Sequence, residues 1–171
     1  MQYPIGKFQL PNPQAATNNR KTHLQQLSEF PKQFAAAARE VDARGLLNQT
    51  YREDGWTARQ VIHHVADSHV NAYVRHKRIL TEEHPTLTPY DEKRWAELAD
   101  VEIVRTEVSL ALIEQLHYRL VNLLANIPDS DWERTAHHGG AGVDYRLDQL
   151  AAQYAWHGRH HLGHLRVILE R

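Results

Sequence analysis

The segment that decides the fold reads Trp56-Thr57-Ala58-Arg59-Gln60-Val61-Ile62-His63-His64-Val65-Ala66-Asp67-Ser68-His69. Its start carries a signature of helix initiation. Thr57 and Gln60 fit the capping box, in which each of two side chains bonds to the other residue's backbone N–H. Trp56 and Val61 flank this box at the positions of a hydrophobic staple. We therefore expect a helix that begins at Thr57 and runs to about Glu82.

Three further segments carry apolar side chains at helical spacing: residues 18–41, 106–126 and 146–170. Pro31 lies inside the first of them. Because proline removes a backbone hydrogen bond, we expect a kink or a break there. Pro128 ends the second of these segments. Four long amphipathic helices with few strand signals predict an all-α protein, a four-helix bundle.

The remaining residues connect these helices within a single domain, 1–171. Residues 1–15 contain three prolines and form an N-terminal arm. Residues 43–55 form a polar connection, and residues 84–100 form a long loop that can hold one short helical turn. Residues 129–145 include His137-His138-Gly139-Gly140-Ala141-Gly142, which suits a hairpin turn or an irregular loop.

Composition restricts the class of protein. The net charge of -1 argues against a nucleic-acid binder that depends on electrostatics. The chain has no apolar run of 18 residues and no signal-peptide pattern, so we expect no membrane association and a cytoplasmic protein. It has no cysteine and 13 histidines. A transition metal would therefore be held by imidazole and carboxylate groups.

The last helix contains a pair of histidines within Trp156-His157-Gly158-Arg159-His160-His161. Residues at i and i+4 share a helix face, so His157 and His161 can reach one ion. By helical angle His164 falls near His157, whereas His160 points elsewhere. A third imidazole from a facing helix would leave coordination positions open, which is typical of a catalytic site.

The third imidazole comes from the upstream histidines. On that helix His69 lies near the centre of the apolar stripe and His64 at its edge, so spacing alone does not choose between them, while His63 points away. Asp67 lies one turn after His64. It could accept the second ring N–H of a ligating histidine, or it could be a solvated carboxylate, and we weigh the two equally.

Isolated histidines are usually surface or hydrogen-bonded residues, which is our interpretation of His23, His84 and His117. Gly158 and Gly163 lie inside the last predicted helix, where each costs about 1 kcal/mol relative to alanine. Glycines inside a helix occur mainly where function or close packing requires them. Gly158 also stands where His-Glu-x-x-His zinc proteases place their general base, so a base must come from another element.

Three stretches together resemble a known family. They are Gly55-Trp56-Thr57-x-Arg59-Gln60-Val61-x-His63-His64-x-Ala66-Asp67-Ser68-His69, Pro89-Tyr90-Asp91-Glu92-Lys93-x-Trp95, and Trp156-His157-x-x-x-His161-x-x-His164. In this order, and with Tyr3-Pro4-Ile5-Gly6 before them, they resemble the YfiT-type metal-dependent hydrolases of the DinB superfamily. The resemblance implies a four-helix bundle, a homodimer, and one divalent ion per subunit held by His64, His157 and His161.

The same resemblance implies three hypotheses for the function. The leading hypothesis is a hydrolase in which zinc or nickel activates water for attack on a small-molecule substrate. One alternative is a metal-dependent thiol S-transferase, because relatives in the wider superfamily use bacillithiol, mycothiol or glutathione and a metal deprotonates a thiol. A second alternative is a non-catalytic metal-binding stress protein.

Overall fold

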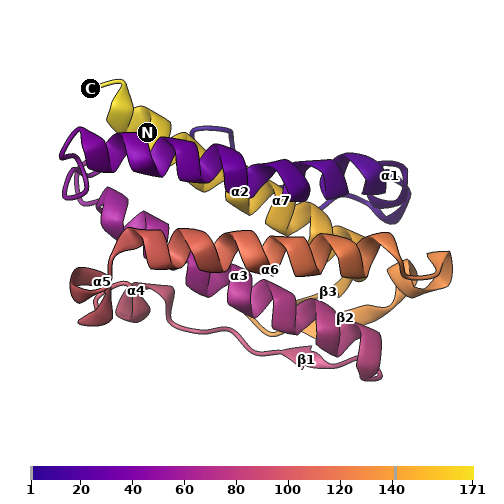
Figure 1. The fold of residues 1–171 in the computed structure, drawn as a ribbon. Helices are drawn as coiled ribbons and strands as arrows, with labels where there is room; N and C mark the ends of the chain where they lie inside the picture. Colours follow the sequence, from indigo (N-terminus) through magenta and orange to yellow (C-terminus); the bar gives the residue numbers. More distant parts are fainter. Residues whose placement is uncertain (1, 141) are drawn as a thin grey trace.

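The computed structural model describes residues 2–140 and 142–171. Four long helices form a bundle (Figure 1): α2 (Arg20–Ala43), α3 (Ala58–Thr81), α6 (Thr106–Ala125) and α7 (Leu147–Leu169). Helices α6 and α7 each pack against both α2 and α3. The order around the core is therefore α2, α7, α3, α6. The all-α four-helix bundle expected from the sequence is confirmed.

The capping box at the start of α3 is present as predicted. The Gln60 backbone N–H donates to Oγ1 of Thr57 at 3.2 Å, and the Thr57 backbone N–H donates to Oε1 of Gln60 at 3.0 Å. Together these bonds satisfy two donors that a helix start otherwise leaves free. The first turn of α3 is thus fixed locally, and the histidines that follow lie at defined positions.

The N-terminal half of the bundle departs from the expectation in two ways. Residues 13–18, partly assigned to an arm, form the short helix α1 (Pro13–Asn18). Helix α2 continues through Pro31, so of the kink or break expected there, the break was wrong. Pro31 cannot donate to the carbonyl of Leu27 one turn earlier. That carbonyl instead accepts from Nδ1 of His117 at 2.7 Å, which offsets the missing bond.

Outside the bundle lies a small sheet of β1 (Thr86–Leu87), β2 (Thr135–His138) and β3 (Val143–Arg146), in the order β1-β2-β3. Strand β1 pairs with β2 in parallel, and β2 pairs with β3 in antiparallel orientation. The hairpin alternative for residues 129–145 is confirmed, although Ala141 lies outside the described residues. A 3-10 helix, η1 (Asp129–Glu133), precedes it.

The loop expected at residues 84–100 contains more structure than the sequence indicated. It holds β1 and two short helices, α4 (Glu92–Trp95) and α5 (Asp100–Ile103). The expectation of one short helical turn was therefore incomplete. Figure 1 shows α4 and α5 beside one end of α3, away from the sheet. This loop places α4 near the first turn of α3, where Nε2 of Gln60 donates to the carbonyl of Ala96 at 3.0 Å.

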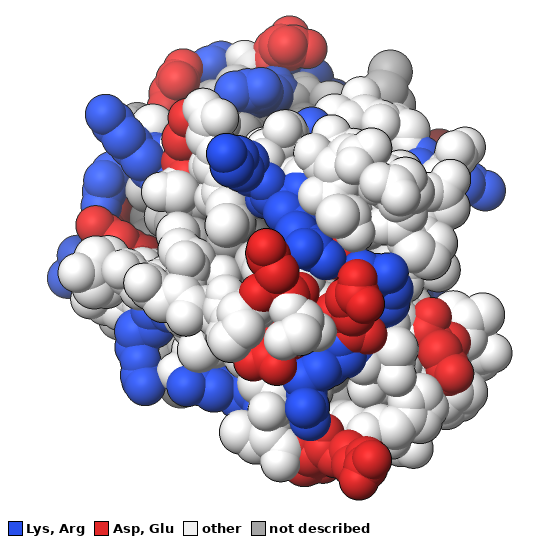
Figure 2. Space-filling view, turned by 90° about the vertical axis from the view of Figure 1, so that its right-hand side faces the viewer, with Lys and Arg blue, Asp and Glu red and all other residues white. Residues whose placement is uncertain are grey.

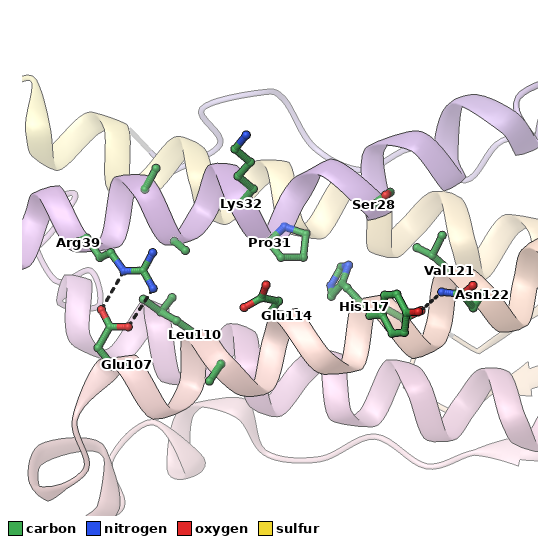
Figure 3. A pocket seen from close by; sticks show the side chains of 14 residues that line it. Ser28, Pro31, Lys32, Arg39, Glu107, Leu110, Glu114, His117, Val121 and Asn122 are labelled. Carbon is green, nitrogen blue, oxygen red and sulfur yellow. Dashed lines mark hydrogen bonds and ion pairs between the residues drawn. The ribbon is translucent and has the colours of Figure 1, made fainter.

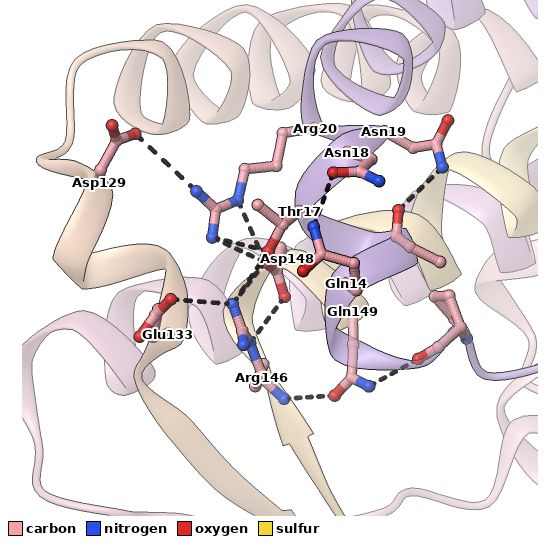
Figure 4. A network of polar contacts seen from close by, with 12 residues as sticks. Gln14, Thr17, Asn18, Asn19, Arg20, Asp129, Glu133, Arg146, Asp148 and Gln149 are labelled. Carbon is pink, nitrogen blue, oxygen red and sulfur yellow. Dashed lines mark hydrogen bonds and ion pairs between the residues drawn. The ribbon is translucent and has the colours of Figure 1, made fainter.

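A buried carboxylate links the beginning of α7 to the beginning of α2 through hydrogen bonds (Figure 4). Asp148 is fully buried, and its Oδ2 accepts from Nη2 of Arg20 at 2.9 Å and from Nη2 of Arg146 at 3.0 Å. The Thr17 hydroxyl donates to the same oxygen. Charge-assisted bonds from two guanidinium groups compensate for the burial of this charge.

The surface carries charges of both signs. Figure 2 shows Lys and Arg interspersed with Asp and Glu over the end of the bundle that lies on the right in Figure 1. This face therefore presents mixed charge. Within residues 2–140 and 142–171, none of the helices is both long and apolar enough to cross a membrane.

Candidate metal centre

Three histidines from two neighbouring helices converge in the core, between the first half of α3 and the middle of α7. His64 of α3 and His157 and His161 of α7 each offer a ring nitrogen, and the three atoms lie within 4.8 Å of one another. The Nε2 atoms of His64 and His157 are 3.4 Å apart. An ion held tetrahedrally at about 2.0–2.1 Å from two imidazole nitrogens places them about 3.3 Å apart. The separation thus fits a shared ion.

The electrostatics of these rings also suit a cation. The pKa of His64 is lowered to about 4, chiefly by burial and in part by the nearby His160 and His164. Burial is likewise the largest cause that holds the pKa values of His157 and His161 well below 6.5. All three rings are therefore neutral at pH 7, and a neutral imidazole has a lone pair for a metal.

A second group of histidines overlaps the first, because a ring nitrogen of His161 also lies near those of His160 and His164. The expectation that His160 points away from this region was wrong. Its ring is buried, stacks on Trp156 at 4.6 Å and lies 5.0 Å from the ring of His161. The N-terminal arm covers this side of α7, with the Tyr3 ring 5.9 Å from that of His160.

Hydrogen bonds show how the second group differs from the first. Nε2 of His164 lies 3.1 Å from the carbonyl oxygen of Gln2, which can only accept, so this nitrogen carries the proton. Nδ1 of His164 then accepts from Nδ1 of His161 at 3.3 Å. This leaves Nε2 of His161 unprotonated and available to the first group. His164 thus orients His161 and has both of its own nitrogens occupied.

His69, which spacing could not separate from His64, has a different environment. Its Nε2 lies 3.1 Å from Nδ1 of His157, and its Nδ1 lies 2.7 Å from Nε2 of His117. Both ring nitrogens therefore have partners, whereas Nε2 of His64 faces the centre. His63, expected to point away, lies with Nδ1 2.8 Å from Oγ of Ser109 on α6.

Asp67 stands apart from the three rings. Burial raises the pKa of its carboxyl, and the nearby Asp100 raises it further. Among the described residues, its carboxylate has no hydrogen bond to a histidine. Of the two roles weighed for Asp67, acceptance of a ring N–H is not seen. The contacts that orient His157 and His161 come instead from His69 and His164.

Sequence reasoning missed the carboxylate that does line the site. The three histidines open into a pocket of about 330 Å³, and Glu92 of α4 contributes to its wall. Burial raises the pKa of this carboxyl, and the Arg75 cation lowers it in part. Its one signal was its place in Pro89-Tyr90-Asp91-Glu92-Lys93. The wall also includes Gln2, Tyr3, Tyr51, Trp56, Trp156, His160 and His164.

Comparisons with known proteins identify the family of this chain. The model of the DinB superfamily matches residues 26–165. A Bacillus cereus AH820 protein named "Putative metal-dependent hydrolase" is 41% identical over 171 residues, 100% of this chain and 96% of the relative. A protein of the same name from Bacillus anthracis A0248 gives the same values.

A solved structure aligns over the same length. YfiT from Bacillus subtilis, described as a probable metal-dependent hydrolase with an unusual four-helix bundle topology, superimposes with a TM-score of 0.92 at 38% identity. The match covers 99% of this chain and 96% of YfiT. The family model and full-length relatives together show that this chain belongs to the DinB superfamily, among proteins named as metal-dependent hydrolases.

Proposed function

We propose that this protein is a metal-dependent hydrolase whose divalent ion is held by His64, His157 and His161. The observation that carries the proposal is the convergence of three neutral imidazoles, with two Nε2 atoms 3.4 Å apart. An all-imidazole donor set suits zinc or nickel. The names of the relatives in Bacillus support the same reaction class.

The pocket supplies the other parts that hydrolysis needs. When bound, a divalent ion held by three protein ligands acts as a Lewis acid that activates water, or a small thiol in the alternative reaction. Glu92 lines the same pocket, and its raised pKa brings the carboxyl closer to the range of a general base. Trp56, whose ring lies 4.6 Å from that of His64, forms an apolar wall. A pocket of about 330 Å³ suits a small substrate.

The test compares two reactions in one set of samples. Protein loaded with zinc or nickel is assayed with a panel of esters and amides, without thiol. It is also assayed with monochlorobimane, with and without bacillithiol, mycothiol, glutathione or coenzyme A. Thiol-independent hydrolysis that is lost in His161→Ala is the expected result.

Other outcomes select the alternatives. Turnover that requires a thiol and is lost in His161→Ala would replace the hydrolase by the thiol S-transferase. Metal binding without turnover in either arm would favour the non-catalytic metal-binding protein. A homodimer in the cytoplasm remains part of the proposal, and sedimentation equilibrium of the purified protein tests the dimer.

A further inference from the structure

A continuous line of hydrogen bonds runs from the candidate metal centre across the core. Nδ1 of His157 lies 3.1 Å from Nε2 of His69, and Nδ1 of His69 lies 2.7 Å from Nε2 of His117. Nδ1 of His117 lies 2.7 Å from the carbonyl oxygen of Leu27. The four residues come from α7, α3, α6 and α2, so the line visits each long helix once.

The last partner sets the direction of every bond in this line. A carbonyl oxygen only accepts, so His117 carries its proton at Nδ1. A neutral ring has one proton, which makes Nε2 of His117 an acceptor for the Nδ1–H of His69. Nε2 of His69 is then an acceptor for the Nδ1–H of His157. It follows that Nε2 of His157, the atom that faces His64, carries a lone pair.

The last ring of the line is neutral on separate grounds. Burial lowers the pKa of His117 to about 4. The ring of Phe30 lies 5.4 Å from that of His69 and 5.2 Å from that of His117, which restricts both imidazoles within an apolar wall. A neutral His117 has a single ring proton, and the bond to the Leu27 carbonyl places that proton at Nδ1.

Pro31 explains why the Leu27 carbonyl is available in the middle of a helix. In an unbroken α-helix this oxygen would accept the N–H of the residue four positions later, and that residue is Pro31, which has none. Pro31 and His117 both line the groove of about 700 Å³ between α2 and α6, shown in Figure 3. The proline thus leaves one acceptor free at the place where His117 reaches α2.

We propose that Pro31, His117 and His69 are positioning residues that hold His157 as its Nδ1–H tautomer and direct the Nε2 lone pair to the metal centre. This inference rests on the proposed metal site for its purpose but not for its geometry. Groups that fix a ligating histidine in this way typically contribute about 10-fold to 100-fold to metal affinity.

The tautomer is tested first, in protein freed of metal by a chelator. Long-range ¹H–¹⁵N spectra at pH 7.5 distinguish a protonated from an unprotonated ring nitrogen. We expect His157 and His69 to be protonated at Nδ1 only. An Nε2–H tautomer at His157, or a mixture of both forms, would overturn the proposed role of this line of hydrogen bonds, whether or not the protein binds metal.

Metal affinity is tested next, with zinc and with nickel, by competition against a chromophoric chelator. His69→Leu keeps a similar core volume but removes both hydrogen bonds, so zinc affinity should fall about 10-fold to 100-fold. His69→Gln can still accept from His157 and donate to His117, so its affinity should lie nearer the unaltered protein. Equal loss in the two variants, or none in His69→Leu, would contradict the proposal.

Pro31→Ala separates positioning from simple packing. Alanine restores the backbone N–H, which competes with His117 for the Leu27 carbonyl and also suits a helix interior better than proline. We expect unfolding midpoints that are unchanged or higher, together with a several-fold weaker zinc affinity. Unchanged affinity would overturn the role of Pro31. The unaltered protein could also fail to bind metal while its tautomers are as expected. In that case the proposed function fails, whereas the line of hydrogen bonds that fixes the tautomer of His157 stands.

Discussion

At the scale of single residues, two groups of histidines share His161, and substitutions can tell which one binds the ion. We predict that His64→Ala and His157→Ala lose most of the bound metal, because each removes one of three ligands. His160→Ala should retain it, since that ring belongs only to the second group. Elemental analysis of zinc-loaded protein after desalting measures the content. Metal loss in His160→Ala with retention in His64→Ala would place the ion in the second group.

Glu92 offers a second prediction at this scale. Glu92→Gln keeps the size of the side chain but removes the proton acceptor. We expect kcat of the hydrolysis to fall about 10²-fold to 10⁴-fold, with unchanged metal content. Asp91→Asn is the matched control, because this neighbouring carboxylate caps α4 and does not line the pocket. Equal kcat for Glu92→Gln and the unaltered protein would remove Glu92 from the mechanism.

The sequence predicts histidine positions better than histidine roles. Helical spacing brings His157 and His161 together because i and i+4 share a face. It does not separate His64 from His69, since the difference lies in which ring nitrogens already have partners on α6 and α7. Glu92 comes from a connecting loop, whose path no periodic pattern describes.

At the scale of elements, close packing explains the two glycines inside α7. A Cβ on Gly158 would lie 2.8 Å from Cδ2 of Phe30, a buried ring of α2, and a Cβ on Gly163 would lie 2.7 Å from Cγ of Pro4 in the arm. The glycines therefore permit α7 to approach α2 on one side and the arm on the other. The costs in helix propensity noted from the sequence are offset by this contact.

Alanine at these positions should have different effects. For Gly158→Ala we expect a net loss of stability, because overpacking against a core ring costs about 1–3 kcal/mol and exceeds the gain in helix propensity of about 1 kcal/mol. Gly163→Ala should change stability less, since the arm can shift. Urea denaturation of both variants measures the difference. A Gly158→Ala protein more stable than the unaltered one would contradict this account of the α2–α7 contact.

The long helices could be predicted from the sequence, whereas the short elements could not. Apolar residues at a 3.6-residue period and the capping box at Thr57 located the four helices to within a few residues. Strand β1 has only two residues and pairs with β2 far along the chain, so it has no local signal. The break expected at Pro31 failed for a tertiary reason, because a side chain of another helix satisfies the carbonyl that proline leaves free.

At the scale of the whole molecule, the bundle is built around histidines that are buried in neutral form. His76 is fully buried, and its Nδ1 donates to the carbonyl of Ala72 at 2.7 Å. Burial lowers the pKa of His76 to about 4, as it does for His117 on the facing helix. In a core of this kind the free energy of unfolding depends on pH, because unfolding returns each ring to a pKa near 6.5.

This coupling predicts that the protein loses stability in mild acid. Because the folded-state pKa of His76 lies below the unfolded value, its contribution is complete above pH 6.5 and is lost as pH falls towards 4, where the unfolded state binds the additional proton. One such ring accounts for on the order of 3 kcal/mol over that interval. Urea denaturation of chelator-treated protein should therefore give falling free energies of unfolding between pH 7.5 and 5. His76→Leu should make the decline shallower, because it removes one titrating ring. A free energy of unfolding that stays constant over this interval would contradict this account of His76 as a ring that is buried in neutral form.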